Sequence, residues 1–544
     1  MTIRHALRRA LSEARSRAIE AGDIRLPEGV APDTLPPVSV EQPARAEHGD
    51  YASNAAMQLA PLARANPMQL ADGLRRHLQP PPGVAEVTVE RPGFINLRLD
   101  PRWLAGQVGA VLADGPSWGR SDVAGGQAVN VEYISANPTG PLHIGNARGG
   151  FIGDVLANVL DATDHRVTRE YYVNNAGSQI RDFGESVYLA RTGQSGEAGY
   201  RGEYIQRLAN DVPAEVIAAV NPLEAIGEWA WNRVFDDIKA TLARLGMRFD
   251  VYKSETELHA AGEVERGVAL LRERGWVYDA DGAVWFRATA FGDEKDRVLI
   301  RSNGAPTYFA ADVAYLLDKF ERGFDRLVYI LGPDHHGDVA RLKGACAALG
   351  HDPERMEIII YQHVSLAGGA KMSKRAGTFV SLDELVEEVG VDATRFFFSM
   401  RSSSQHLEFD LELAKRQSNE NPVYYVQYAH ARCCSILGKA AEMEVAIDAS
   451  QAGRLLKHPS ELGLIRHLVR LPEVVEDAAE RRETHELPRY CMETASAFSA
   501  FYRDCRVLSD DVELSRTRLT LVDATRQVLA NALGLLGISA PRSM

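Results

Sequence analysis

The sequence predicts a mixed α/β protein built around a doubly wound, Rossmann-type parallel sheet, with a small α/β unit before it and an all-helical unit after it. A β-rich run from Ala128 passes through a turn rich in Pro and Gly into a helical pattern over 144–160. Strand patterns at 327–331 and 357–361 alternate with further helical patterns, which is typical of a parallel α/β sheet. After about Val391 the strand patterns disappear, which predicts the helical end.

The first unit, residues 1–115, is expected to open with a long helix. Its apolar residues recur at helical spacing: Ile3, Leu7, Ala10, Leu11, Ala14, Ala18 and Ile19. This Arg-rich opening is similar to a mitochondrial transit peptide, but it also carries the acidic residues Glu13, Glu20 and Asp23. A folded first helix is therefore the better interpretation.

The rest of this unit is expected to contain helical turns over 55–62 and 67–78 and then strands. The clearest strand covers 94–99, where side chains alternate: Phe94, Asn96 and Arg98 on one face, and Ile95, Leu97 and Leu99 on the other. The Gly-rich stretch 119–127 has the composition of a linker. A new domain is expected to begin at about residue 122.

The second and third parts of the chain are expected to be a sheet domain over 122–390, with a helical insertion around 185–245, and a helical domain over 391–544. Long amphipathic segments in the third part predict its helices: 411–437, 462–480 and 519–536. The length of 544 residues suits three or four domains, each with its own core.

Composition excludes several classes of protein. Hydrophobic residues make up 45 % and charged residues 25 %, which fits neither a disordered nor a membrane protein. The five cysteines form no C-x-x-C pair, which argues against a zinc ribbon and a disulfide scaffold. A formal net charge of −13 is the wrong sign for binding nucleic acid by charge alone. We expect a cytoplasmic protein with no membrane partner and no structural metal.

The first motif is Pro141-Leu142-His143-Ile144-Gly145-Asn146, where the first strand of the sheet domain turns into its helix. Backbone N–H groups at a helix N-terminus favour phosphate, a glycine allows a nucleotide to approach closely, and His143 can donate a hydrogen bond to a phosphate oxygen. The motif by itself is weak, because a capping turn with a surface histidine would look the same.

The second motif is Lys371-Met372-Ser373-Lys374-Arg375, between Gly368-Gly369 and Gly377. Glycines on both sides indicate a loop that closes over a substrate, and three cations on it suit the charge of a departing polyphosphate. Of the 61 basic residues only ten are lysines, so two lysines within four positions are conspicuous. A compact point charge is favoured here.

The two motifs together match the HIGH and KMSKS signatures of class I aminoacyl-tRNA synthetases, and the chain resembles the arginyl-tRNA synthetases over its full length. The matching segments are VEYISANPTGPLHIGNARG (131–149), YYVNNAGSQI (171–180), TYFAADVAYLLDKF (307–320), YILGPDHHGDVARLKGA (329–345), KMSKRAGTFVSLDELVEEVGVDATRFFF (371–398) and NPVYYVQYAHAR (421–432). Two positions depart from the signatures: Asn146 stands where many relatives have His, and Arg375 ends the second motif. Neither departure indicates an inactive enzyme.

The resemblance implies an activity and a set of residues. The reaction is ATP-dependent ligation of L-arginine to its cognate tRNA through arginyl adenylate, with Mg²⁺ on ATP. Catalytic roles fall on His143, Asn146, Lys371 and Lys374. The ATP site would include Gly145, Gly332, Asp334, His335, Met372 and Ser373. Arginine would be bound by Glu132, Asn137, Tyr308 and Asp312, and the spacing of the last two puts them on one helical face. A guanidinium group requires such carboxylates.

The flanking domains are then explained by tRNA. The family's first domain contacts the D-loop at the tRNA elbow, which assigns Arg91, Phe94 and Asn96 to that contact. The helical domain is similar to the family's anticodon-binding domain, so Tyr424, Tyr425, Tyr428 and Met544 are candidates for contacts with unstacked bases. One or two of these tyrosines are expected in the core. We expect a monomer.

Three alternatives remain open from the residues. A class I synthetase for cysteine, glutamine or glutamate shares both motifs without needing Tyr308 and Asp312. A non-catalytic tRNA-binding paralogue would not need His143, Gly145, Lys371 and Lys374. A simple nucleotidylyltransferase would leave the first and third domains without a purpose.

Overall fold

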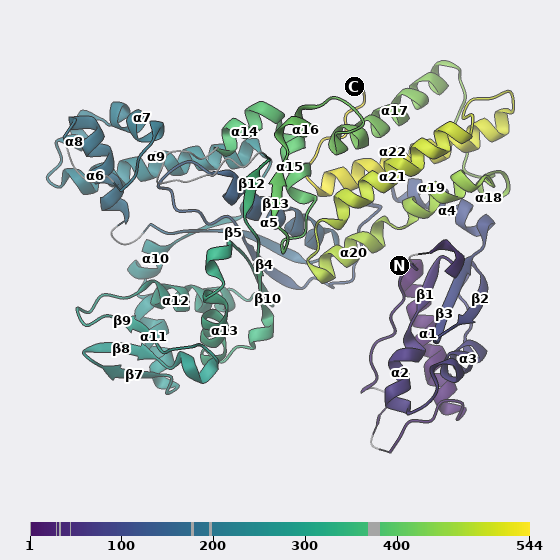
Figure 1. The fold of residues 1–544 in the computed structure, drawn as a ribbon, viewed down its shortest axis with the longest axis horizontal. Helices are drawn as coiled ribbons and strands as arrows, with labels where there is room; N and C mark the ends of the chain where they lie inside the picture. The colour runs from purple at the N-terminus through teal and green to yellow at the C-terminus, as the bar shows by residue number, and fades with distance from the viewer. Residues whose placement is uncertain are drawn as a thin grey trace.

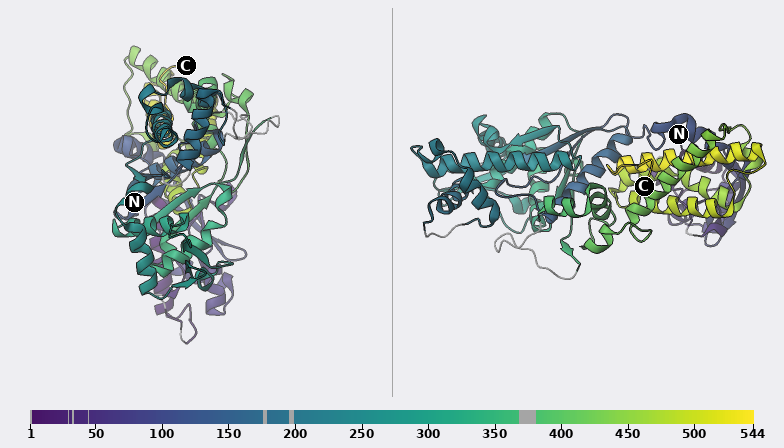
Figure 2. Two further views of the ribbon diagram at one scale, coloured as in Figure 1. Left: turned by 90° about the vertical axis from the view of Figure 1, so that its left-hand side faces the viewer. Right: turned by 90° about the horizontal axis from the view of Figure 1, so that it is seen from above.

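The computed structural model describes residues 2–28, 30–31, 34–43, 45–175, 179–194, 199–367 and 381–544. Within these ranges the chain folds into an N-terminal α/β unit, a central parallel sheet with a helical insertion, and a bundle of C-terminal helices (Figure 1). The N-terminal unit and the C-terminal helices lie at one end of the molecule, and the insertion lies at the other (Figure 2).

The N-terminal unit packs helices against a small antiparallel sheet of order β1-β3-β2. Its elements are α1 (Ile3–Glu20), β1 (Tyr51–Ser53), α2 (Ala55–Ala63), α3 (Pro67–His77), β2 (Val84–Glu90) and β3 (Phe94–Leu99). The predicted first helix is confirmed, since Leu7, Leu11, Ala14 and Ala18 form its buried stripe. The helix α4 (Pro101–Asp114) then leaves this unit and packs among the C-terminal helices.

The central sheet has five parallel strands in the order β11-β10-β4-β5-β6. They are β4 (Ala128–Glu132), β5 (Arg166–Val173), β6 (Val251–Ser254), β10 (Arg326–Leu331) and β11 (Met356–Ile360). The chain starts in the middle at β4, moves outward to β6, and returns to β10 on the other side of β4. The strand order therefore reverses between β4 and β10, and ligands of such sheets bind outside the carboxyl ends at this point.

Helices and a second small sheet connect these strands. The first connection is α5 (Ile144–Ala162), and the insertion between β5 and β6 consists of α6 (Gln179–Thr192), α7 (Glu203–Asp211), α8 (Ala214–Ile217) and α9 (Pro222–Arg244). Before β10 come α10 (Glu255–Ala260), α11 (Glu263–Glu273), β7 (Val277–Ala280), β8 (Ala283–Phe286), β9 (Arg297–Ile300) and α12 (Tyr308–Glu321); α13 (Asp338–Ala348) follows β10. The antiparallel sheet β7-β8-β9 was not predicted, because four-residue strands give almost no periodic signal.

The C-terminal part corrects two expectations. Its elements are β12 (Val364–Leu366), α14 (Leu382–Val389), α15 (Val391–Ser399), β13 (Leu407–Phe409), α16 (Leu411–Lys415), α17 (Pro422–Glu442), α18 (Ala452–Leu455), α19 (Pro459–Val469), α20 (Leu471–Arg481), α21 (Glu486–Asp504) and α22 (Val512–Leu535). The expectation that strands are absent after Val391 is wrong, because β13 pairs with β12. The predicted helices over 411–437 and 462–480 are each broken in two, with Pro422 and Pro472 at the new helix starts, where proline is tolerated.

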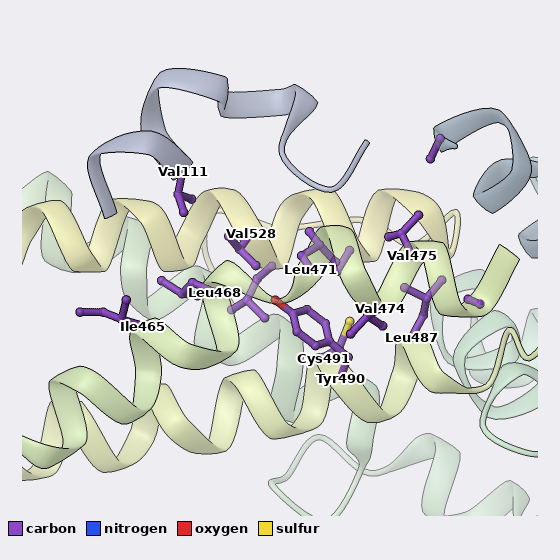
Figure 3. Close-up of a cluster of buried hydrophobic side chains, with 14 of the residues drawn as sticks. Val111, Ile465, Leu468, Leu471, Val474, Val475, Leu487, Tyr490, Cys491 and Val528 are labelled. Carbon is purple, nitrogen blue, oxygen red and sulfur yellow. The ribbon is translucent and has the colours of Figure 1, made fainter. Parts of the chain in front are cut away.

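The three parts share extensive contacts. Val111 of α4 packs with Leu468, Leu471 and Val528 in a buried cluster of C-terminal helices (Figure 3). The N-terminal unit docks on α20, where the Tyr51 Oη donates to Glu473 Oε1 over 3.0 Å. The expected linker 119–127 is bound to the end of α5 through backbone hydrogen bonds, so it is an ordered connection.

Candidate active site

A cavity of about 830 Å³ opens at the carboxyl edge of the central sheet, where the strand order reverses. The end of β4, the start of α5, the start of α12 and the short 3₁₀ helix η5 (Pro333–His335) all contribute to its lining. Ten of the predicted site residues line it: Glu132, Asn137, His143, Gly145, Asn146, Tyr308, Asp312, Gly332, Asp334 and His335. The predicted residues Lys371, Met372, Ser373 and Lys374 lie outside the described residues.

His143 and Asn146 form a capping box at the start of α5. The His143 Nδ1 accepts hydrogen bonds from the N–H groups of Gly145 (3.0 Å) and Asn146 (3.3 Å), and the Asn146 side chain accepts from the His143 N–H (3.3 Å). Accepting through Nδ1 places the proton of a neutral ring on Nε2. A Cβ on Gly145 would lie 2.8 Å from the imidazole ring, so glycine is required for this folded-back arrangement. The asparagine that departs from the HIGH signature thus serves as a helix cap.

The chain returns to this helix start at residue 381. The Leu382 N–H donates to the Leu142 carbonyl over 2.8 Å, and Ser381 forms an isolated bridge with His143. Ser381, which comes shortly after the second signature motif, therefore lies beside the first signature motif, although the two motifs are some 230 positions apart in the sequence.

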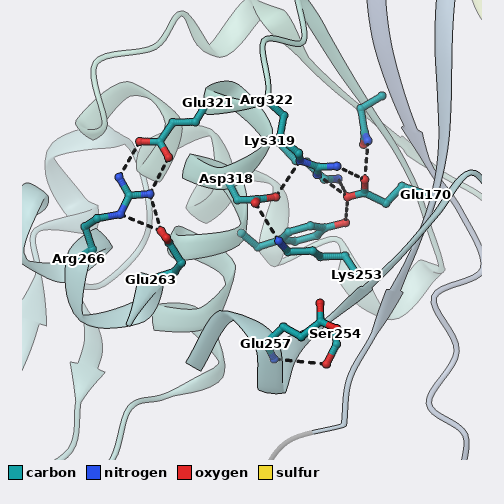
Figure 4. A network of polar contacts seen from close by, with 12 residues as sticks. Glu170, Lys253, Ser254, Glu257, Glu263, Arg266, Asp318, Lys319, Glu321 and Arg322 are labelled. Carbon is teal, nitrogen blue, oxygen red and sulfur yellow. Dashed lines mark hydrogen bonds and ion pairs between the residues drawn. The ribbon is translucent and has the colours of Figure 1, made fainter. Parts of the chain in front are cut away.

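Glu132 is paired inside the protein. Its Oε2 lies 2.6 Å from the Nζ of Lys319, whose side chain is fully buried, and its Oε1 accepts from Ser135. Lys319 also lies over the rings of Tyr315 and Tyr329. The same cation is 4.0 Å from Glu170, which Arg322 holds with a two-pronged contact (Figure 4). The charge of Glu132 is therefore largely compensated without a ligand.

Asp312 lacks such compensation. No described residue forms a hydrogen bond or an ion pair with it, and burial raises the pKa of Asp312 to about 7. The nearby Arg341 opposes this shift, whereas Asp338, Glu255 and Glu132 add to it. Tyr308 stands one turn earlier on α12 and is 49 % exposed at the cavity. An uncompensated carboxylate beside a phenol is a site for a cationic ligand.

Two further residues of this half were not predicted from the sequence. Glu255, at the start of α10, is only 4 % exposed and lines the cavity, and burial raises its pKa. Tyr172, at the end of β5, lines it too, and its hydroxyl faces the Glu255 carboxylate. A carboxylate placed directly after a β strand was the available signal for Glu255, since strand ends meet at the ligand edge.

The wall after β10 carries a short polar chain. The His335 Nδ1 lies 2.9 Å from Asp338 Oδ2, and Arg341 donates to the other oxygen of that carboxylate over 2.6 Å. The hydrogen bond between these two side chains raises the pKa of His335 and lowers the pKa of Asp338. Asn137 donates to Gln179 over 3.0 Å, which ties the loop after β4 to the insertion.

The residues predicted to contact tRNA are only partly at the surface. Arg91 is exposed and Phe94 is 37 % exposed, as expected. Asn96 is only 4 % exposed, although it alternates along β3 with the exposed Phe94 and Arg98, so its assignment to tRNA stays a prediction.

The predicted aromatic residues of the third part lie on α17. Tyr424 and Tyr428 stack in parallel, Tyr425 reaches the Ser499 hydroxyl over 3.2 Å, and all three are half-buried. Arg432 lies between the rings of Tyr428 and Tyr502. Near the chain end, the carbonyls of Ser539 and Pro541 form hydrogen bonds with Gln427 and His430 of α17. Met544 at the chain end is 51 % exposed.

The part of the chain that the structure describes brings together no group of three or more His, Cys, Asp or Glu side chains suited to a metal ion. None of its helices is long and apolar enough to cross a bilayer.

Comparisons with known proteins cover the whole chain. Residues 1–99 match the family model "Arginyl tRNA synthetase N terminal domain", 107–200 and 215–403 match "tRNA synthetases class I (R), catalytic domain", and 426–544 match "DALR anticodon binding domain". The arginine–tRNA ligase of Moorella thermoacetica is 47 % identical over 98 % of each chain, and that of Heliobacterium modesticaldum is 45 % identical over both full chains.

The solved structures agree. The arginyl-tRNA synthetase of Thermus thermophilus superimposes with a TM-score of 0.78 at 26 % identity, over 99 % of this chain and all of that one. The methionyl-tRNA synthetase of Mycobacterium tuberculosis shares the fold alone, with a TM-score of 0.54 at 16 % identity. Relatives this similar along the full length, together with a catalytic-domain match around the cavity, show that this chain belongs to the class I arginyl-tRNA synthetases.

Proposed function

We propose that the cavity activates arginine with ATP in two halves, one for each substrate, before the arginyl group passes to tRNA. The observation that carries this proposal is the position of Asp312, an uncompensated carboxylate, in the same cavity as the N-terminus of α5. A cationic side chain and a polyphosphate can therefore be bound side by side.

The acidic half would bind arginine. Asp312 and Glu255 would pair with the guanidinium group, and the Tyr308 and Tyr172 hydroxyls would add hydrogen bonds. Glu132, already paired with Lys319, would help Asn137 to hold the α-amino end rather than the guanidinium group. An isolated carboxylate that pairs with a guanidinium group makes the site bind arginine much more tightly than neutral amino acids. A neutral amino acid would leave the carboxylate desolvated and without a partner.

The other half would bind ATP as its Mg²⁺ complex. Gly332 and Asp334 would face the ribose, His335 would lie near the adenylate, and the α5 N-terminus with Gly145, His143 and Asn146 would face the phosphates. Met372 and Ser373 would complete the ATP site. Lys371 and Lys374 would neutralise the leaving pyrophosphate.

The chemistry needs no protein nucleophile. A carboxylate oxygen of arginine attacks the α-phosphorus of ATP in line, the bond to the β-phosphate oxygen breaks, and pyrophosphate leaves with its electron pair. The enzyme contributes positioning and charge through His143, the α5 N-terminus, Lys371 and Lys374. The arginyl group then passes to the 2′-hydroxyl of the terminal adenosine of tRNA, and AMP is released.

The tRNA would lie along the end of the molecule where the first and third parts meet. Arg91 and Phe94 offer a cation and an aromatic face for the tRNA elbow, and Tyr424, Tyr428 and Met544 offer surfaces for anticodon bases. We further propose that the enzyme acts as a monomer in the cytoplasm, where its substrates are.

The test of this proposal is ATP–pyrophosphate exchange with each amino acid, with and without total tRNA. Exchange that depends on arginine alone among the amino acids, and on tRNA, is the expected result. Exchange with cysteine, glutamine or glutamate would contradict the acidic pocket, and no exchange with any amino acid would favour the non-catalytic paralogue.

The role of the second signature motif is tested by Lys374→Ala. Loss of a charge donor to the leaving group should lower the exchange rate about 10²-fold. Lys239→Ala, on the exposed face of α9, serves as the control and should leave the rate unchanged. Exchange at the normal rate in the Lys374 variant would remove this motif from the mechanism.

A further inference from the structure

Arg148 lies in the second turn of α5, and its side chain is completely buried. Its guanidinium group donates only to backbone carbonyls. Nη1 donates to Gln362 and His363, both at 3.1 Å, and Nη2 donates to Ser402 over 2.8 Å and to Gln405. One side chain thus joins α5 to two segments that lie more than 200 positions further along the chain.

Burying a guanidinium group in this way costs desolvation free energy, which a purely structural contact would not need. Among the described residues no carboxylate pairs with Arg148, and burial lowers its pKa to about 10. An apolar side chain would fill the same space without desolvating a charge. A planar fork with fixed donor directions does what an apolar side chain cannot, because it sets the relative position of four carbonyl groups.

The segments that Arg148 holds form one wall of the cavity. Gln362, His363 and Val364 line it, directly after β11. They are also hydrogen-bonded to the second segment, since the Gln362 N–H donates to Ser403 and the Leu407 N–H donates to His363.

The residue next to Arg148 tightens the same contact. A Cβ on Gly149 would lie 2.5 Å from the ring of Tyr361, so glycine lets this wall approach α5 closely. The helix start that carries His143 and the wall after β11 are therefore fixed to each other by Arg148 and Gly149.

We propose that Arg148 is a positioning residue for the ATP half of the site: it holds the wall of residues 361–364 at a fixed distance from the phosphate-binding start of α5. The inference rests on the proposed function. Apart from Glu132 at the end of β4, the arginine half is built by β5, α10 and α12, and the hydrogen bonds of Arg148 reach none of these elements. Its effect should therefore fall on ATP and on the activation rate, and not on arginine binding.

The experiment compares Arg148→Lys with Arg395→Lys. Arg395 is equally buried, and it bonds the carbonyls of Leu245 and Leu536 and the carboxylate of Asp154, outside the cavity lining. Lysine keeps the charge in both variants but cannot make the fork of hydrogen bonds. We measure thermal stability and, in exchange with tRNA present, the KM for ATP, the KM for arginine and kcat.

The expected result is a fall of at least tenfold in kcat/KM for ATP in Arg148→Lys, with the KM for arginine within twofold of the native value. Arg395→Lys should lose thermal stability but keep the native kcat/KM for ATP. Native ATP kinetics in Arg148→Lys, or equal changes for both substrates, would overturn the positioning role. Absence of exchange in the native enzyme would instead overturn the proposed function.

A second measurement does not depend on how the variant folds. Hydrogen exchange of the native enzyme is followed with and without the Mg²⁺ complex of ATP. If the wall belongs to the ATP half, ATP should slow exchange in peptides covering 361–367 and 402–409 at least threefold. Unchanged exchange in both peptides would overturn the inference.

Discussion

Two buried cations contact residues that line the cavity, and they are held in different ways. Lys319 lies in the arginine half, 2.6 Å from the Glu132 carboxylate and against two tyrosine rings. Arg148 lies in the ATP half and contacts only carbonyl oxygens. Lysine supplies a compact charge, whereas arginine supplies several hydrogen-bond donors in fixed directions. The comparison indicates that the arginine half is organised by charge balance and the ATP half by backbone geometry.

In the arginine half the charge of Asp312 is left without a partner among the residues that the structure describes. Lys319 compensates Glu132, and Arg322 compensates Glu170, but no described residue pairs with Asp312. The substrate's guanidinium group would supply the missing cation.

Asp312→Asn removes the uncompensated charge and should have the largest effect. We expect kcat/KM for arginine to fall about 10³- to 10⁴-fold, because the guanidinium group would be desolvated with Glu255 as its one remaining partner in this proposal. The KM for ATP should stay within twofold, and exchange kinetics measure both. Asp318→Asn is the control: it changes the same residue type on α12 at a carboxylate that faces Lys253 and Arg322 instead. A similar loss in both variants would contradict the division into halves.

Lys319→Met tests the compensated part of the same half. Removal of a fully buried cation leaves Glu132 without its partner and should cost about 3–5 kcal/mol of stability. Lys253→Met breaks a pair of the same chemistry, 2.8 Å from Asp318 but partly exposed, and should cost less than about 1 kcal/mol. Urea denaturation of the two variants measures the difference. Equal losses of stability in the two variants would mean that burial does not strengthen the pair of Lys319 and Glu132.

The pH dependence of arginine binding is the smallest effect. With the pKa of Asp312 near 7, most of this carboxyl is protonated at pH 6 and ionised at pH 8, while the guanidinium group stays charged. Only the ionised form attracts the substrate. The KM for arginine should therefore fall about tenfold between pH 6 and pH 8. Asp312→Asn should lose this dependence, and a native KM that is flat over this range would show that Asp312 is already ionised at pH 6.

Local patterns in the sequence predicted much of the fold. The stripe of α1, the strand–turn–helix around His143 and the i, i+4 pair of Tyr308 and Asp312 are all properties of short segments, and the structure has each of them. The family resemblance, which the comparisons confirm, rests on motifs of the same kind. The sequence was a poorer guide to where one helix ends and the next begins. Helices α17 and α20, each with a proline at its start, begin inside segments that were predicted as single helices.

The family, the parallel-sheet class and the first signature motif at a helix start all follow from the sequence. The pairing of Glu132 with Lys319, the burial of Asn96, the place of Glu255 in the cavity and the hydrogen bonds of Arg148 to the wall after β11 appear only in the folded chain. The physical reason is the range of the interaction. A helix or a cap is fixed by residues within a few positions, but the charge balance of a site depends on partners such as Lys319 and Glu132, which are 187 positions apart and meet only when the sheet has formed.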